Sequence, residues 1–166
     1  TITATGMTTN DSITASPTGV ISANTMTFKP AKLTITANSL PTTGNVSLGA
    51  KKALYVSWAF STSGSGENVK ISAITLANET ATTTNLDSVT LYDVTNKTNC
   101  TTKYPNATLD SYGCLLAVKD GYDGTTTWTL SDPIIITKNT TISLELRADV
   151  RSTAATYQNH ADGFVI

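Results

Sequence analysis

Charged residues are scarce in this chain: Asp, Glu, Lys and Arg together make up 14% of its 166 residues, against about 25% in an ordinary globular domain. The 11 basic and 12 acidic side chains leave a net charge of −1 and form no basic run. Neutralising phosphates or anionic lipid requires clustered Lys and Arg. We therefore expect neither nucleic acid nor a charged membrane surface as a partner.

Long apolar runs, histidines and an initiator methionine are also missing. No apolar run approaches the ~20 residues of a membrane helix, so no membrane span is expected. His160 is the single histidine, which is too few for a zinc site, and no Ser or Cys stands in a frame such as G-x-S-x-G. The sequence thus predicts a protein that is not an enzyme and needs no cofactor. Its start at Thr1 suggests a processed form.

Threonine takes the place of the missing charge at about a fifth of all positions, and hydrophobic residues make up 39% of the chain. Threonine is β-branched and fits a pleated strand better than a helix. The clearest strand runs from Ile142 to Val150, where every second residue is apolar, and Leu54 to Phe60 alternates in the same way. Such alternation gathers apolar side chains on one face of a strand, so the sequence predicts an all-β protein.

The segment 69–76 alternates in two phases, because Val69 and Ile71 share one parity whereas Ile74 and Leu76 have the other. A β-bulge near Ser72 would return all four side chains to one face. Several short strands separated by turn-forming residues are typical of an immunoglobulin-like β-sandwich. The other predicted strands are 25–28, 32–36, 89–92, 115–118, 127–130 and 134–136, and the predicted turns are 41–44, 63–66, 120–124 and 131–133.

The two ends of the chain suggest a strand that is exchanged between domains. Residues 1–19 begin with alternation and continue like a linker, so we expect an extended N-terminal strand, separate from a sandwich over 20–166. The apolar residues 164–166 are typical of a strand cut short. A strand from elsewhere can pair with an open sheet edge and fill its groove; the alternative is that residues 1–6 pair within their own domain. The candidate donor residues are Ile2, Ala4, Ile13 and Ala15.

Cys100 and Cys114 are the only cysteines, and their even number predicts a disulfide. Both lie in a polar, turn-rich segment in which a free thiol would be exposed; the alternative is two separate buried thiols. Closing a loop of about 15 residues contributes roughly 3 kcal/mol in the chain-entropy model. With the sequons described next, the disulfide favours an extracellular protein at the cell surface.

Asn-x-Ser/Thr sequons occur about twice as often as the composition predicts by chance. Asn96, Asn99 and Asn106 cluster around the cysteine loop, which we expect to be a glycan-bearing surface, although a disulfide at Cys100 would crowd Asn99. The seven candidate glycosylation sites are Asn10, Asn45, Asn78, Asn96, Asn99, Asn106 and Asn139.

Four stretches carry a resemblance to a known family, namely 68–76, 85–93, 128–134 and 144–153. They resemble the repeated immunoglobulin-like domains in large surface proteins of candidate phyla radiation bacteria. In that family a final strand similar to residues 1–6 follows the last stretch, whereas here it stands first. The resemblance implies a domain whose last strand comes from a neighbouring subunit, similar to donor-strand pilins, or from an adjacent repeat.

The expected function is structural: a subunit of an extracellular filament, pilus-like, or of a surface layer, polymerising head-to-tail by β-strand complementation. Its partners would be identical subunits or adjacent repeats, and glycans. The alternative is a standalone adhesion or carbohydrate-binding module of a tandem-repeat surface protein. Such a module needs an exposed aromatic row, but Trp58 shares its parity with Leu54 and Val56, which predicts that it packs in the core.

Overall fold

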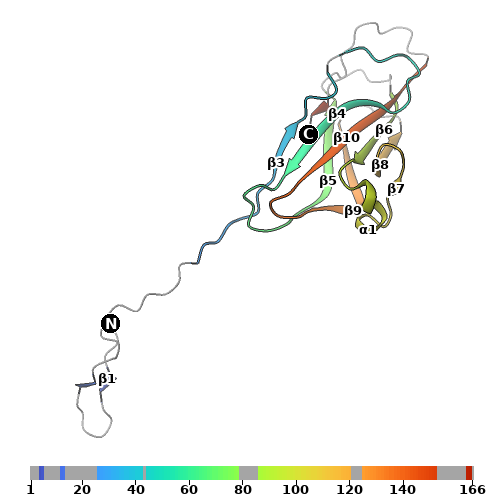
Figure 1. Ribbon diagram of the computed structural model, residues 1–166. Coiled ribbons are helices and arrows are strands. Elements are labelled where there is room, and N and C mark those ends of the chain that lie inside the picture. The colour runs from blue at the N-terminus through green and yellow to red at the C-terminus, as the bar shows by residue number, and fades with distance from the viewer. Residues whose placement is uncertain are drawn as a thin grey trace.

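A computed structural model describes residues 4–5, 12–13, 26–42, 44–78, 86–120, 125–152 and 164–165 (Figure 1). Apart from a 3₁₀ turn (Lys97–Asn99) and a one-turn helix α1 (Cys100–Lys103), the regular elements of these residues are strands, which confirms the all-β class. The strands are β1 (Ala4–Thr5), β2 (Ser12–Ile13), β3 (Thr34–Ala37), β4 (Ala53–Ser61), β5 (Val69–Asn78), β6 (Leu86–Asp93), β7 (Thr108–Leu109), β8 (Cys114–Asp120), β9 (Thr126–Ile136), β10 (Thr141–Val150) and β11 (Phe164–Val165).

Two antiparallel sheets face each other as a sandwich (Figure 1). The larger sheet has the strand order β3-β4-β10-β6-β8-β7, and the smaller has the order β11-β5-β9. Their inner faces enclose one hydrophobic core. Its largest fully buried apolar side chains include Phe60, Leu76, Leu86, Leu91, Ile134, Ile136, Leu144 and Leu146.

The central strand of the larger sheet is β10, which pairs with β4 on one side and with β6 on the other. Ile142, Leu144, Leu146, Ala148 and Val150 are each at most 6% exposed, as the alternation predicted. The residues between them are only partly buried and lie on the outer face. Because a slip of one residue would turn all five apolar side chains outward, burial fixes the register of this strand.

The pairing irregularity predicted near Ser72 is present, because the register of β5 against β9 shifts between Ile71 and Ala73, but the extra residues lie on β9. Ile71 pairs with Ile134 and Ala73 pairs with Thr129, so Ser72 stands opposite four residues of β9. Beyond the bulge, Ile74 and Leu76 are buried. The irregularity therefore keeps both apolar pairs of this strand on the inner side.

The predicted turn at 131–133 is wrong, because β9 is one continuous strand from Thr126 to Ile136. The buried apolar residues of β9 all stand at even-numbered positions, so the alternation continues through the predicted turn. These residues are Trp128, Leu130, Ile134 and Ile136. Pro133 lies in the irregular stretch of β9 opposite Ser72, where a residue without an N–H is tolerated. The unbroken alternation of apolar residues indicates a strand here, but the turn-forming residues at 131–133 pointed to a turn instead.

The predicted strand at 25–28 is also wrong: residues 26–33 form no strand, and β3 begins at Thr34. The pattern of this segment alternates, but nothing in the described part of the chain pairs with it. A strand is completed by a neighbour that accepts and donates its backbone hydrogen bonds. The arm, as we call residues 26–29, extends away from the sandwich (Figure 1).

The candidate donor segments form a two-stranded sheet with each other, in which Ala4 pairs with Ile13 and Thr5 with Ser12. Ile2, Ala15 and residues 20–25 lie outside the described residues, so the donor assignment and the domain boundary at residue 20 stay predictions. At the other end, β11 pairs with the last residues of β5, Phe164 with Asn78 and Val165 with Ala77.

Truncating the central strand tests this core. Leu144→Ala should lower the free energy of unfolding by about 2–5 kcal/mol, because Leu144 is fully buried and the cavity left behind cannot collapse completely. Its neighbour Ser143 lies on the outer face of the same strand, so Ser143→Ala should change stability by less than about 0.5 kcal/mol. Urea unfolding of both variants measures the difference, and equal losses would contradict the assignment of faces.

Candidate assembly surface

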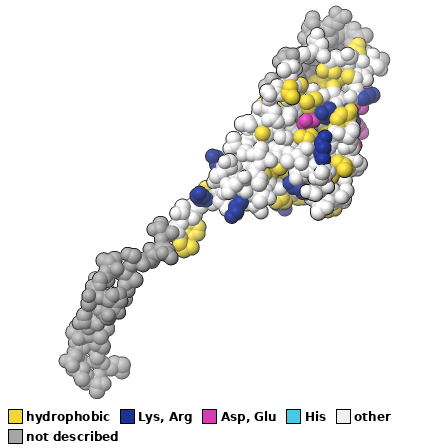
Figure 2. Space-filling view, in the orientation of Figure 1, with side chains coloured by type: hydrophobic (Ala, Val, Ile, Leu, Met, Phe, Trp, Pro, Cys, Tyr) yellow, Lys and Arg dark blue, Asp and Glu magenta, His cyan; other side chains and the backbone are white. Residues whose placement is uncertain are grey.

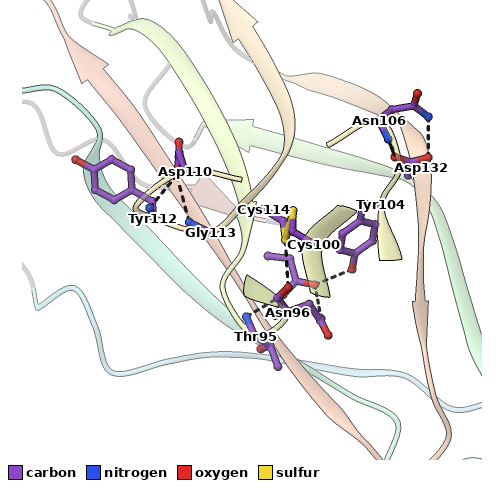
Figure 3. Close-up of a disulfide and its surroundings, with 11 residues drawn as sticks. Thr95, Asn96, Cys100, Tyr104, Asn106, Asp110, Tyr112, Gly113, Cys114 and Asp132 are labelled. Atoms are coloured by element: carbon purple, nitrogen blue, oxygen red, sulfur yellow. Dashed lines mark hydrogen bonds between the residues drawn. A yellow bond between two sulfur atoms is a disulfide. The ribbon is translucent and has the colours of Figure 1, made fainter. Parts of the chain in front are cut away.

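One side of the sandwich is closed by the segment between β6 and β8, which we call the cysteine loop (residues 94–113). Cys100, Tyr104 and Ala107 of this loop pack against the core. The backbone N–H and the Nδ2 of Asn106 donate to the Asp132 carboxylate of β9 at 2.7 and 2.9 Å (Figure 3). The loop thus links the β8 end of the larger sheet to the smaller sheet.

The predicted disulfide joins Cys100 at the start of α1 to Cys114 at the start of β8, with their Cα atoms 5.5 Å apart (Figure 3). The expectation that these cysteines lie in an exposed polar segment is wrong, because their exposed fractions are 2% and 0%. The polar residues around them in sequence face outward while the sulfur atoms point to the core. The bond therefore holds the cysteine loop against the closed side.

A buried carboxylate anchors the start of the cysteine loop. Asp93 ends β6 and is 0% exposed. Its Oδ1 accepts the backbone N–H groups of Thr95 and Asn96 at 2.9 and 3.1 Å, and its Oδ2 accepts Asn96 Nδ2 and the Tyr104 hydroxyl, both at 2.6 Å. These four hydrogen bonds replace the water that the carboxylate loses. Burial, the hydrogen bond to Asp93 and its negative charge raise the pKa of Tyr104 far above its ordinary value.

The outer face of the larger sheet is covered by the last residues of the cysteine loop. Tyr92 of β6 is 0% exposed and donates its hydroxyl to Asp110 at 2.7 Å. Burial and this carboxylate raise the pKa of Tyr92 strongly. Partial burial opposes ionisation of Asp110, but hydrogen bonds from Tyr92 and from the N–H groups of Tyr112 and Gly113 outweigh it and lower the pKa of that carboxyl.

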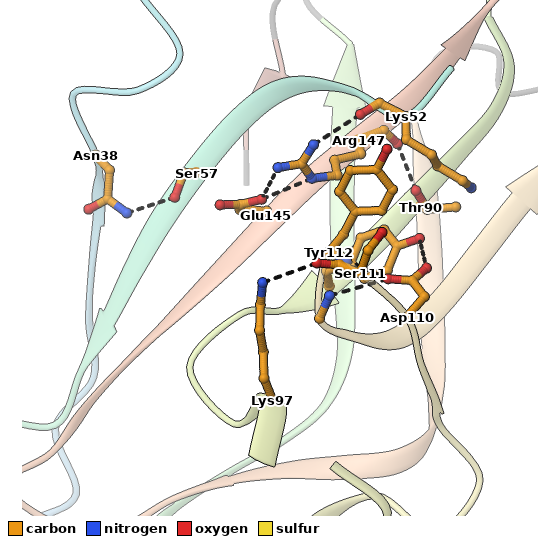
Figure 4. Close-up of polar contacts among 12 residues, drawn as sticks. Asn38, Lys52, Ser57, Thr90, Lys97, Asp110, Ser111, Tyr112, Glu145 and Arg147 are labelled. Carbon is orange, nitrogen blue, oxygen red and sulfur yellow. Dashed lines mark hydrogen bonds and ion pairs between the residues drawn. The ribbon is translucent and has the colours of Figure 1, made fainter. Parts of the chain in front are cut away.

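Arg147 of β10 completes this cover (Figure 4). Its guanidinium lies 4.4 Å from the centre of the Tyr112 ring, a cation–π contact. The same group donates to Glu145 Oε2 at 2.9 and 2.7 Å and to the Lys52 carbonyl at 3.0 Å. Arg147 is therefore engaged both with the cysteine loop and with Glu145, so these two charged side chains of β10 do not form an open site.

On the opposite side of the sandwich, the described residues form no such cover. The larger sheet ends there in β3. The smaller sheet ends there in the two residues of β11, which are the only described residues paired with the edge of β5 that faces away from β9. That pairing is confined to Ala77 and Asn78, so within the described part of the chain no strand is paired with residues 69–75 on this edge. Free sheet edges of this kind are templates for a strand of another chain.

An apolar groove of about 310 Å³ runs between these two edges. Ile35 of β3 pairs with Phe60 of β4, which places both side chains on the inner face, and Ile35 is still 38% exposed. The irregular pairing at Ser72 directs Ile71 and Ile74 to the same space from the other sheet. The groove is lined by Leu33, Ile35, Phe60, Ile71, Ala73, Ile74 and Thr75.

The sequence predicted the strands that line this groove but not the groove itself. Alternation marks the inner face of a strand, whereas the position of the strand at an edge or in the middle of a sheet depends on pairing. The exposed Ile35 on a Thr-rich strand gave no signal that distinguishes it from an ordinary core residue. The candidate donor residues Ala4 and Ile13 are the partners of each other, not of the groove.

The sequons differ in how far their amides are engaged. Asn45, Asn99 and Asn139 are exposed, and Asn139 uses only its Oδ1, which accepts the Gly64 N–H at 3.1 Å. By contrast, Asn96 is partly buried and donates to Asp93, and Asn106 donates to Asp132. The side chains of Asn10 and Asn78 lie outside the described residues.

No family model, curated protein or solved structure matches the chain. In the described part of the chain, no helix has the length and apolar character to cross a membrane. The described residues also contain no cluster of three His, Cys, Asp or Glu side chains fit to hold a metal ion.

Reduction tests the role of the disulfide. The reduced protein should unfold at a lower urea concentration, with a loss of about 3 kcal/mol expected for a loop of about 15 residues. The double variant Cys100→Ser/Cys114→Ser should match the reduced protein in direction and lose its response to reductant. If the native chain unfolds at the same urea concentration with and without reductant, the disulfide does not stabilise the fold.

Alkaline titration tests the two buried phenols. The folded-state pKa values of Tyr92 and Tyr104 are raised above the unfolded value, so their contribution to stability is complete below about pH 10 and is lost as pH rises further. At least two of the six tyrosines should therefore ionise only together with unfolding. Tyrosinate absorbance, followed alongside near-ultraviolet circular dichroism, measures this. Six phenols ionising near pH 10 in a folded chain would contradict it.

Proposed function

We propose that this chain is a structural subunit of an extracellular filament or surface layer, and that it polymerises head-to-tail by β-strand complementation. The observation that carries the proposal is the apolar groove between the edges of β3 and β5. A strand added there would pair with unused backbone groups and bury alternate side chains between the sheets. Identical subunits, or adjacent repeats of one long chain, would supply that strand.

The surface chemistry supports an extracellular location. A protein exposed to an oxidising environment gains from a disulfide, and this chain has no free cysteine among its described residues. The visible face of the molecule is mostly uncharged (Figure 2). Asn45, Asn99 and Asn139 present exposed amides on which glycans would be accommodated without breaking a hydrogen bond donated by the amide.

A carbohydrate-binding or adhesion module is the second candidate, and the aromatic residues disfavour it. Trp58 and Trp128 are 4% and 5% exposed, and Tyr92 and Tyr104 are fully buried. Sugar platforms present exposed aromatic faces, whereas these four rings lie in the core or under the cysteine loop.

A charge placed in the groove tests the proposal. Ile35→Glu should abolish assembly, because an inserted strand would bury the new carboxylate without a partner. Val118→Glu is the matched control: Val118 is an apolar strand residue of similar exposure, 49% against 38%, and lies on β8 near the other end of the sheet. Negative-stain microscopy and light scattering of the full chain measure assembly, and thermal unfolding verifies that both variants fold.

The outcomes separate the two candidate functions. Filaments or large assemblies from the native chain and from Val118→Glu, with monomers from Ile35→Glu, support the proposal. Monomers from the native chain under all conditions, or assemblies that tolerate Ile35→Glu, would refute strand complementation at this groove.

A further inference from the structure

The arm carries the two most exposed large hydrophobic side chains of the described residues. Met26 is 79% exposed and Phe28 is 89% exposed. They are two positions apart in a segment without regular structure, so in an extended conformation both point to the same side. Figure 2 shows the hydrophobic patch on the arm, away from the sandwich. Alternating, solvent-exposed apolar residues on an unpaired segment are the pattern of a strand that lacks its sheet.

The base of the arm is held firmly against the sandwich. The N–H of Gly66 donates to the Pro30 carbonyl at 3.2 Å, and the N–H of Lys32 donates to Ser65 Oγ at 3.1 Å. Gly66 also approaches Lys29 so closely that a Cβ there would lie 2.0 Å from the Lys29 carbonyl oxygen. Only glycine permits this approach, which sets the direction in which the arm leaves.

This anchoring keeps the arm out of the groove of its own chain. Residues 30–32 connect the arm directly to Leu33 and β3, which form one wall of that groove. For Phe28 to enter, the chain would have to reverse within residues 29–33 and break both anchoring hydrogen bonds. A second copy of the chain has no such constraint.

We propose that residues 26–28 of one copy are the strand that fills the β3–β5 groove of a second copy, with Met26 and Phe28 as the inserted side chains. The inference rests on the proposed function and names its donor. Met26 and Phe28 provide apolar side chains for a groove lined by Leu33, Ile35 and Ile71, and the arm backbone pairs with the free part of the β5 edge. The donor therefore lies next to the sandwich and not in residues 1–15.

Disulfide trapping between two differently labelled copies tests this contact. One copy carries Phe28→Cys and the other carries Ile35→Cys, and the native cysteines are already paired and buried. Oxidation of the mixture should give a heterodimer band that reductant removes. The matched control is Thr27→Cys in place of Phe28→Cys, because Thr27 would point away from the groove and should cross-link far less. Equal cross-linking by both cysteines, or none by Phe28→Cys in assembled material, would overturn the assignment.

Substitution in the arm distinguishes a wrong donor from a wrong function. Phe28→Ser should weaken association about ten- to hundred-fold, since it removes one buried aromatic side chain, and Met26→Ser/Phe28→Ser should abolish assembly. Ile13→Ser should leave assembly unchanged. If Ile35→Glu stops assembly while Met26→Ser/Phe28→Ser does not, the groove is used but the donor is another segment. If Ile13→Ser alone stops assembly, residues 1–15 are the donor. If Ile35→Glu has no effect, the proposed function itself fails.

Discussion

The rest of this structure depends on the pairing of β10 with a strand on each side. The alternation of this strand places five apolar side chains against the opposite sheet, and its register with β4 and β6 aligns their inner residues in the same layer. Phe60 lies beside Ile142, and Leu91 lies beside Leu146. Because burial on one face specifies register, the three central strands fix the position of both edges of the larger sheet.

The two edges of the larger sheet differ in what covers them, and the proposed function is inferred from this difference. On the β8 side, a disulfide-bonded loop reaches across the sandwich to Asp132 and seals the core. On the β3 side, the described residues leave the groove between Ile35 and Ile71 open, beside an arm that bears exposed Met26 and Phe28. In the proposed assembly, the groove of one copy and the arm of another would provide the two halves of a contact between chains. Assembly by strand addition would bury both.

The sequence predicted most strands because the alternation of apolar and polar residues can be recognised within a single short segment. It located β4 and β10, and from a change of phase it placed the irregular pairing of β5 near Ser72. It failed at Ser131–Pro133, where turn-forming residues hid a continuous parity, and at Met26–Phe28, where the alternation of a strand had no partner. It paired the cysteines correctly but placed them at the surface, since the polarity of sequence neighbours does not report where one side chain points.

What the sequence by itself determined is the all-β class, the inner face of each long strand and the disulfide, because alternation and cysteine number need no knowledge of distant residues. Only the tertiary structure decided which strands became edges. That choice follows from hydrogen-bond pairing between segments far apart in the chain, such as β3 with β4 and β5 with β9. The groove exists because two edges, one from each sheet, come to lie side by side and no strand of the described residues lies between them.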